Sequence, residues 1–196
     1  VVDHNRYATE SSSLTRTIGN VQQQTTLFIG REQQIAQIGE LLHTGAVVSI
    51  IGAGGIGKTA IALRIAQTLR EHYAGIWMME LASLRDAKLL NHYLLSVLGL
   101  QHEPGRTELD VLLDYVQNKR LLFILDNCEH LIDESASLIE QLIAVNPQLH
   151  LIVTSRESLN IAAEQVYRLP PLTIPETTEP EHTADHAATA PSESVQ

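Results

Sequence analysis

Short apolar stretches recur along the chain, and amphipathic stretches with apolar residues three or four positions apart lie between them. The apolar stretches predict strands at residues 46–51, 75–81, 121–125, 149–153 and 165–169. The amphipathic stretches predict helices over residues 35–42, 58–72, 89–98, 109–116 and 131–145. Strands that are apolar almost throughout are typical of parallel sheets covered on both faces. The alternation therefore predicts an α/β fold, with a parallel sheet, right-handed crossovers and helices on both faces.

The two ends of the chain differ in composition from its centre. Residues 1–26 are polar and rich in Ser, Thr and Gln, so we interpret them as a flexible linker. Residues 27–172 hold the predicted strands and helices and form the predicted domain. Residues 173–196 are acidic and rich in Ala, Thr and Pro, which predicts a disordered tail. Because the chain begins with Val1 and residues 192–196 resemble the start of a helical segment, we expect a fragment of a longer protein.

Charge and cysteine content narrow the classes of function. The formal net charge is −10, and no Lys or Arg follows Arg168, so we expect no direct nucleic-acid binding by this segment. No apolar stretch approaches the roughly 18 residues of a membrane span and no secretory signal is visible, so we expect no membrane partner. A lone cysteine, Cys128, fits a reducing compartment, and we expect a cytoplasmic location. We interpret Cys128 and His130 as a half-buried thiol and a surface histidine, because a zinc site needs more ligands.

A glycine-rich sequence follows the first predicted strand and opens the next predicted helix. It reads Gly52-Ala53-Gly54-Gly55-Ile56-Gly57-Lys58-Thr59, followed by Ala60. Residues without a Cβ allow the backbone to approach an anion, and the helix that follows presents its positive end. In this pattern the Lys58 ammonium bridges the β- and γ-phosphates of a nucleotide and the Thr59 hydroxyl ligates Mg²⁺. The sequence therefore predicts a site for ATP or ADP with Mg²⁺.

Polar residues at the ends of two other predicted strands complete this candidate site. Asp126 ends an apolar strand, as does the aspartate that holds magnesium in P-loop enzymes, and strand carboxyl ends share one sheet edge. Asn127 follows where a second acid could stand, and it is a possible water-orienting group. Glu129 is the nearest candidate base, or else an acid that favours a helix N-terminus. Arg156 follows another strand and either contacts the γ-phosphate or forms an exposed ion pair.

Taken together, these motifs resemble the STAND class of P-loop ATPases, close to the NB-ARC or AP-ATPase type found in large bacterial LuxR-type and antibiotic-regulatory transcriptional regulators. The resemblance covers about residues 27–172 and includes the motifs at 28–32, 52–59, 125–131, 154–157 and 167–172. It implies a three-layer sandwich with a five-stranded sheet in the order 5-1-4-3-2. It also implies that Ile29, Gly30 and Arg31 lie near the adenine and ribose, and that Arg156 is the sensor arginine.

The resemblance also implies a function and partners. We expect an ATP-binding and ATP-hydrolysing switch domain of a multidomain signalling or transcriptional regulator. Its partners would be a helical lid domain that lies beyond this chain, a winged helix and helical repeats, with nucleotide-dependent self-association as a further expectation. A scaffold that binds nucleotide without hydrolysis is an alternative, because Asn127 stands where an acid could. A small-molecule kinase ranks last, because Arg106 is alone in its loop within the Leu-rich span 86–119.

Overall fold

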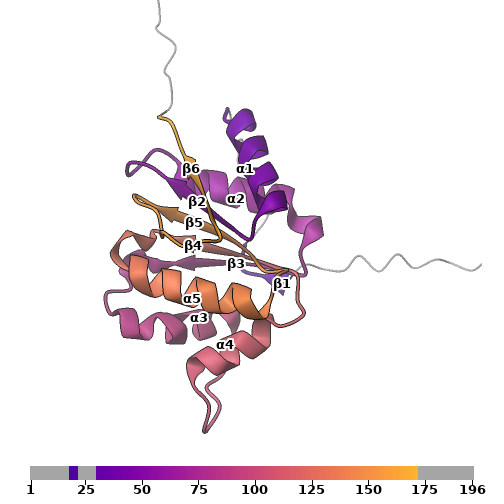
Figure 1. Cartoon of the computed structure of the whole chain (residues 1–196), viewed down its shortest axis with the longest axis vertical. Coiled ribbons are helices and arrows are strands. Elements are labelled where there is room, and N and C mark those ends of the chain that lie inside the picture. Colours follow the sequence, from indigo (N-terminus) through magenta and orange to yellow (C-terminus); the bar gives the residue numbers. More distant parts are fainter. Residues whose placement is uncertain (1–17, 22–29, 172–196) are drawn as a thin grey trace, which may run out of the picture.

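A parallel sheet of six strands runs through the computed structural model, which describes residues 18–21 and 30–171. All five strand pairs are parallel, and the order across the sheet is β1-β3-β4-β5-β2-β6 (Figure 1). The strands are β1 (Ile18–Gly19), β2 (Val47–Ile51), β3 (Gly75–Glu80), β4 (Leu121–Asp126), β5 (His150–Ser155) and β6 (Glu164–Arg168). The five strands predicted from the sequence are β2 to β6, and their predicted order is confirmed.

The sixth strand, β1, differs from the prediction, because the polar composition of residues 1–26 predicts a linker. Gly19 lies so close to β3 that a Cβ there would be 1.8 Å from the Ile76 carbonyl oxygen. The Asn20 side chain then pairs like a strand residue: its Nδ2 donates to Met78 O at 2.8 Å, and Met78 N donates to its Oδ1 at 2.7 Å. Val21 is buried. Residues 18–21 therefore belong to the folded domain, and the rest of the predicted linker lies outside the described residues.

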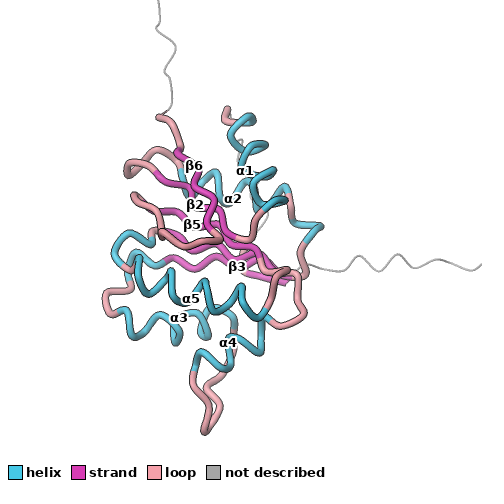
Figure 2. Tube along the Cα trace, in the orientation of Figure 1, coloured by secondary structure: helices cyan, strands magenta, loops and turns pink. Residues whose placement is uncertain are grey.

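Helices cover both faces of the sheet, as Figure 2 shows. One face carries α1 (Glu32–Thr44) and α2 (Lys58–Thr68), and the other carries α3 (Leu90–Leu98), α4 (Glu108–Val116) and α5 (Ile132–Val145). Short 3-10 turns complete the elements: η1 (Arg70–His72), η2 (Leu81–Ser83), η3 (Ala87–Leu89) and η4 (Cys128–His130). The predicted three-layer arrangement is confirmed.

The side chains of each strand point alternately to the two faces of the sheet, and this alternation creates two separate hydrophobic cores. In β4, Leu122 and Ile124 pack in the cluster that includes α1 and α2, whereas Phe123 and Leu125 pack in the cluster that includes α3, α4 and α5. Because successive side chains of a strand point to opposite faces, a strand buried on both sides is apolar at nearly every position. This requirement explains the continuous apolar runs in the sequence.

Local signals in the sequence fix where helices begin and end. Thr107 and Asp110 form a capping box at the start of α4, with Asp110 N donating to Thr107 Oγ1 at 3.1 Å and Thr107 N donating to Asp110 Oδ2 at 3.0 Å. Gly99 ends α3 with a φ of 69°, in the left-handed region that favours glycine. Among the described residues, no helix combines the length and the hydropathy that crossing a bilayer would require.

Candidate nucleotide-binding site

The glycine-rich loop connects the carboxyl end of β2 to the start of α2, as the sequence predicted. Gly55 and Gly57 have φ values of 78° and 95°, which residues with a Cβ rarely adopt. Gly52 has a φ of 156°, which residues with a Cβ rarely adopt, and a Cβ there would lie 2.4 Å from the Ile56 Cδ1 atom and 3.3 Å from the Leu169 carbonyl oxygen. The loop conformation therefore depends on glycine at these three positions.

A cavity of about 300 Å³ opens at this loop. Loop and helix residues line one side, and residues at the ends of β4 and β5 line the other: Gly54, Gly55, Gly57, Lys58, Thr59, Ala60, Asn127, Glu129, Thr154 and Arg156. The first backbone N–H groups of α2 have no acceptor within the helix, and together with the helix dipole they favour a bound anion. The cavity thus has the surroundings that a phosphate group requires.

Lys58 supplies the positive charge inside the loop. Its side chain is almost buried, at 9% relative exposure. The Nζ atom donates to the carbonyl oxygens of Gly52 at 2.9 Å and Ala53 at 3.0 Å, so the loop itself holds the ammonium in position. An ammonium has three donors, and phosphate oxygens are stronger acceptors than these carbonyls because they are charged.

Thr59 and Asp126 meet at the same edge of the sheet. Thr59 Oγ1 donates to Asp126 Oδ1 at 2.7 Å, and Thr154 Oγ1 donates to the same carboxylate oxygen. Asn127 N in turn donates to Thr154 Oγ1 at 3.0 Å. The ends of β4 and β5 and the start of α2 are thereby joined around one carboxylate. In the sequence, Thr154 was only part of a polar strand end, and nothing there indicated its contact with Asp126.

The chemistry of these oxygens fits Mg²⁺. Hydroxyl and carboxylate oxygens are the hard ligands that Mg²⁺ prefers. The 2.7 Å between Thr59 Oγ1 and Asp126 Oδ1 is close to the roughly 2.9 Å that separates neighbouring oxygens of an octahedral shell with metal–oxygen distances near 2.0–2.1 Å. Thr59 and Asp126 are therefore suited to hold the ion, directly or through water.

Glu129 and Arg156 form an ion pair at the mouth of the cavity. Arg156 Nε lies 3.1 Å from Glu129 Oε1, and the side chains are 68% and 19% exposed respectively. Asn127 has a φ of 67°, and its side-chain nitrogen, in the orientation that satisfies both groups, lies 3.0 Å from Glu129 Oε1. The Arg156 guanidinium also reaches over the loop, with Nη2 3.7 Å from where a Gly54 Cβ would stand. The two predicted roles of Arg156, ion pair and phosphate contact, are thus compatible in space.

Of the three residues expected near adenine and ribose, the structure describes Gly30 and Arg31. Ile29 lies outside the described residues. Gly30 has a φ of 84°, and its N–H donates to Glu32 Oε1 at 3.2 Å, which makes it part of the turn that opens α1. Arg31 is only 8% exposed, and its guanidinium donates to the carbonyl oxygens of Ile56 and Pro170, both at 2.9 Å. The Arg31 side chain therefore contacts the glycine loop through the main-chain carbonyl of Ile56, a residue that does not line the cavity.

The two residues that could have suggested a separate metal site have structural partners. Burial raises the pKa of the Cys128 thiol to about 12, so the thiol stays protonated. The ring nitrogen Nε2 of His130 lies 2.8 Å from the Leu84 carbonyl oxygen. His130 is exposed, as predicted, whereas Cys128 is fully buried rather than half-buried.

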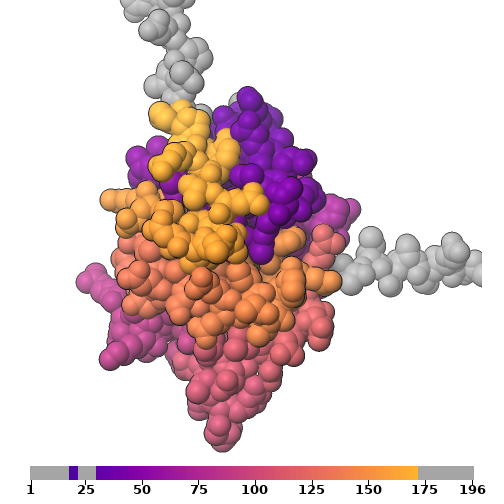
Figure 3. Space-filling view, viewed as in Figure 1, coloured from indigo at the N-terminus to yellow at the C-terminus, as the bar shows by residue number. Residues whose placement is uncertain are grey.

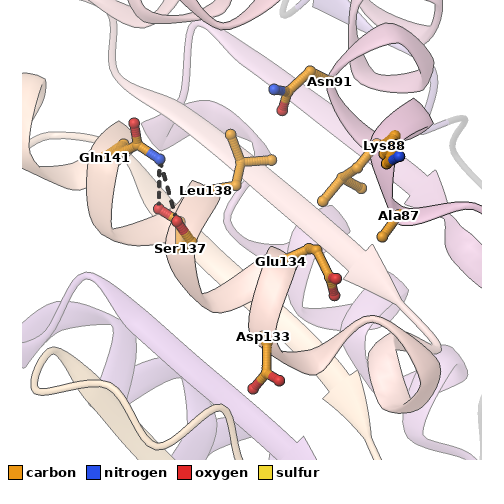
Figure 4. A pocket seen from close by; sticks show the side chains of 9 residues that line it. Ala87, Lys88, Asn91, Asp133, Glu134, Ser137, Leu138 and Gln141 are labelled. Carbon is orange, nitrogen blue, oxygen red and sulfur yellow. Dashed lines mark hydrogen bonds between the residues drawn. The ribbon is translucent and has the colours of Figure 1, made fainter.

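Another cavity, of about 340 Å³, lies between the start of α3 and α5 (Figure 4). Lys88 and Asn91 face it from one side, and Asp133, Glu134 and the hydrogen-bonded pair Ser137 and Gln141 face it from α5 (Figure 4). Two carboxylates against a single ammonium make this cavity unsuited to phosphates. The cavity at the glycine loop therefore remains the candidate for a nucleotide, although it is smaller.

Comparisons with known proteins agree with this site and fold. Residues 27–154 match the family described as AAA ATPase domain. An uncharacterized protein of Mycobacterium tuberculosis is 35% identical over 150 residues, which cover 76% of this chain and 38% of that protein. A protein of the same organism, provisionally named an HTH-type transcriptional regulator, is 36% identical over 134 residues, covering 68% of this chain and 15% of that protein. The chain thus spans well under half the length of these relatives.

Solved structures show the same fold at low sequence identity. A STAND protein with a tetratricopeptide repeat sensor from Pyrococcus horikoshii superposes with a TM-score of 0.55 and 19% identity, covering 76% of this chain and 24% of that one. Cdc6p from Pyrobaculum aerophilum superposes with a TM-score of 0.52 and 15% identity, covering 67% and 40% respectively. These findings agree with the STAND-class resemblance of the motifs. The glycine loop, the sheet order and the matched family model together show that this chain belongs to the AAA ATPase domain family.

Proposed function

We propose that this domain binds Mg-ATP at residues 52–60, hydrolyses it slowly and acts as the nucleotide-dependent switch of a multidomain transcriptional regulator. The observation that carries the proposal is that Lys58 and Thr59 line one cavity and that Thr59 Oγ1 donates to Asp126, which ends a strand and lies 67 residues further along the chain. The packing of α2 against the sheet, of which β4 is a strand, brings these three groups together. A glycine-rich turn without a ligand would not require that convergence.

Each residue of the site has a role in this proposal. Backbone N–H groups of the loop would surround the β- and γ-phosphates, and Lys58 would exchange its bonds to Gly52 and Ala53 for phosphate oxygens. Thr59 and Asp126 would hold Mg²⁺, which neutralises charge on the phosphates. Arg156 would turn from Glu129 to the γ-phosphate, which would free the Glu129 carboxylate to position the attacking water.

The switch role follows from what distinguishes ATP from ADP at such a site. Only ATP has a γ-phosphate for Arg156 to contact. To change a two-state equilibrium from 1:99 to 99:1, the nucleotides must differ in binding free energy between the two states by about 5.5 kcal/mol. Contacts of Arg156 and of the Mg²⁺ shell would supply part of that difference. The relative named as an HTH-type regulator supports a regulatory context, and helical lid, winged-helix and repeat domains of the same polypeptide are the proposed partners.

Two other functions remain to be distinguished by experiment. A scaffold that binds nucleotide without hydrolysis is favoured by one observation, because Asn127 and Arg156 both hold Glu129 and so restrain the candidate base. A small-molecule kinase would need a free cation near an acceptor pocket. Arg106, the arginine of the α3–α4 loop, instead pairs with Glu103 at 3.0 Å and with Asp114, and this pairing counts against the kinase.

Titration calorimetry with Mg-ATP tests the proposal most directly. We expect Lys58→Ala to weaken binding at least about 100-fold, because it removes a buried charge that contacts two phosphates, and charged hydrogen bonds contribute roughly 1.5–3 kcal/mol each. Lys119→Ala is a matched control, since Lys119 lies over the Tyr115 ring at 3.8 Å, away from the cavity. Equal affinities of parent and Lys58→Ala, with both folded, would refute the proposal.

A further inference from the structure

Three segments that are far apart in the sequence meet behind the glycine loop, and one side chain joins them. Arg31 stands at the start of α1. Its Nη1 atom donates to the carbonyl oxygen of Pro170, 139 residues away, and its Nη2 atom donates to that of Ile56 within the loop, both at 2.9 Å. At 8% relative exposure, the guanidinium is largely shielded from water. It therefore bridges the phosphate-binding loop and the residues that follow β6.

Close packing surrounds this bridge. Leu169 N donates to Ile51 O at 2.9 Å, which extends the hydrogen bonding of β6 with β2 to Leu169, directly beside the residue that precedes the loop. The Ile56 side chain and the Leu169 carbonyl both press against Gly52, as the distances to a Cβ at that position show. In the space-filling view, the segment around β6 lies directly against α1 (Figure 3, yellow against indigo). The loop, α1 and residues 169–170 thus form one packed junction.

The chemistry of this bridge requires an arginine. A guanidinium is planar and presents several donors in a fixed fork, so it can serve two carbonyl oxygens through two different nitrogens. A lysine has a single nitrogen and cannot reproduce that fork. Arg31 also adopts a φ of 67°, a backbone conformation that is uncommon outside glycine, and the bonds of its side chain hold it there. Loss of the guanidinium would leave the carbonyl oxygens of Ile56 and Pro170 without this donor.

The position of the bridge links the nucleotide site to the course of the chain beyond the domain. Residues 169–171 lead out of the described structure, and Leu169 and Pro170 are held against the same loop that would hold the phosphates. When phosphates occupy the loop, the Ile56 carbonyl oxygen is held in one position. If the loop moves when nucleotide is released, the Ile56 carbonyl oxygen moves with it. Because coupling between two sites is reciprocal, anything that moves residues 169–171 would also alter the affinity of the loop.

We propose that Arg31 is a positioning residue that couples nucleotide occupancy of loop 52–59 to how firmly residues 169–171 are held. The coupling rests on the proposed function, namely that the loop binds Mg-ATP. It assigns Arg31 a role distinct from the adenine and ribose contact that the family resemblance implies. It also names the place at which a domain following residue 171 would sense the nucleotide.

Hydrogen exchange without nucleotide tests the bridge itself. Arg31→Gln removes the fork and the charge, Arg31→Lys keeps only the charge, and Arg64→Gln, on an exposed position of α2, is the matched control. We expect the amides of residues 52–57 and of Leu169 to exchange about tenfold faster or more in both Arg31 variants, since losing a charged hydrogen bond favours local opening. The control should match the parent. If neither segment changes, or only one does, Arg31 does not join them.

Exchange with saturating Mg-ATP then tests the coupling. In the parent we expect nucleotide to slow exchange both at the loop and at Leu169. In both Arg31 variants we expect nucleotide to slow exchange at the loop alone. Both variants should also bind Mg-ATP about tenfold more weakly. Arg31→Lys that retains parental affinity and protection would show that charge suffices and would overturn the bridge. If the parent loop gains no protection at all, the proposed function fails, and the experiment without nucleotide still decides whether Arg31 joins the segments.

Discussion

Asp126 has two separable roles, and substituting it with Asn and with Ala distinguishes them. Its Oδ1 atom accepts hydrogen bonds from the hydroxyls of Thr59 and Thr154, so it stabilises the fold where α2, β4 and β5 meet. Its negative charge is also the feature that would attract Mg²⁺. Asp126→Asn keeps an acceptor oxygen in the same place and removes the charge. Asp126→Ala removes both.

The structure sets different expectations for the two variants. In Asp126→Ala, Thr59 and Thr154 lose their acceptor, and Thr154 is only 1% exposed, so water does not easily replace it. A buried polar group without a partner costs about 1–3 kcal/mol, and we expect a loss of that size in the free energy of unfolding. In Asp126→Asn this loss should stay below about 1 kcal/mol. Its Mg²⁺-dependent affinity for ATP should nevertheless fall about 10–100-fold, as when an oriented group around a metal is replaced.

Urea denaturation measures the first quantity, and calorimetric titration with ATP in Mg²⁺ or in a chelator measures the second. Asp126→Asn should bind ATP with similar affinity in both media, whereas the parent should bind more tightly with Mg²⁺. The reasoning is refuted if Asp126→Asn keeps the full Mg²⁺ dependence of the parent. It is equally refuted if Asp126→Asn is destabilised as much as Asp126→Ala, because the hydroxyl contacts would then require the charge.

Two further predictions concern hydrolysis and pH. Single-turnover phosphate release should fall at least about tenfold in Glu129→Gln with little change in Mg-ATP affinity, because general-base positioning contributes 10²–10⁴-fold; release that is absent in the parent as well would favour the scaffold. Burial, followed by the positive charges of Arg120 and His43, lowers the pKa of His150, whose Nδ1 lies 2.6 Å from the Tyr73 hydroxyl. Folded His150 therefore binds a proton less readily than the unfolded residue, so the free energy of unfolding should decline as the pH falls below about 6.5. His150→Gln should flatten that decline in urea titrations between about pH 5 and 7, and an unchanged slope would contradict it.

The sequence was informative where a structural requirement shapes every residue of a segment. A strand covered on both faces is apolar almost throughout, and the apolar runs in β2, β4 and β5 made these strands predictable. The glycine loop between β2 and α2 and the aspartate that ends β4 were predictable because their motif restricts the residue type at each position. The strand order came from the family resemblance, since periodicity does not determine which strands are neighbours.

The sequence was uninformative where the structure depends on the contacts of a single side chain rather than on a repeated pattern of residues. β1 has only two residues, and its pairing is continued by the Asn20 side chain, which no periodicity reveals. The direction of the Arg31 guanidinium depends on where residue 170 lies in space, and this position follows only from the packed fold. The contact of Thr154 with Asp126 likewise arises from the neighbouring positions of β4 and β5.

The short strand β1 has a practical consequence for how the domain can be isolated. A version cut to begin at residue 27, where the family match begins, would lack the residues that cover the outer side of β3. The N–H and C=O groups of Met78 would then face solvent at the end of an open sheet. Uncovered edges of this kind invite pairing with other chains, so the shortened protein would be more prone to aggregate than one that retains residues 18–21, in which the very short β1 covers this edge.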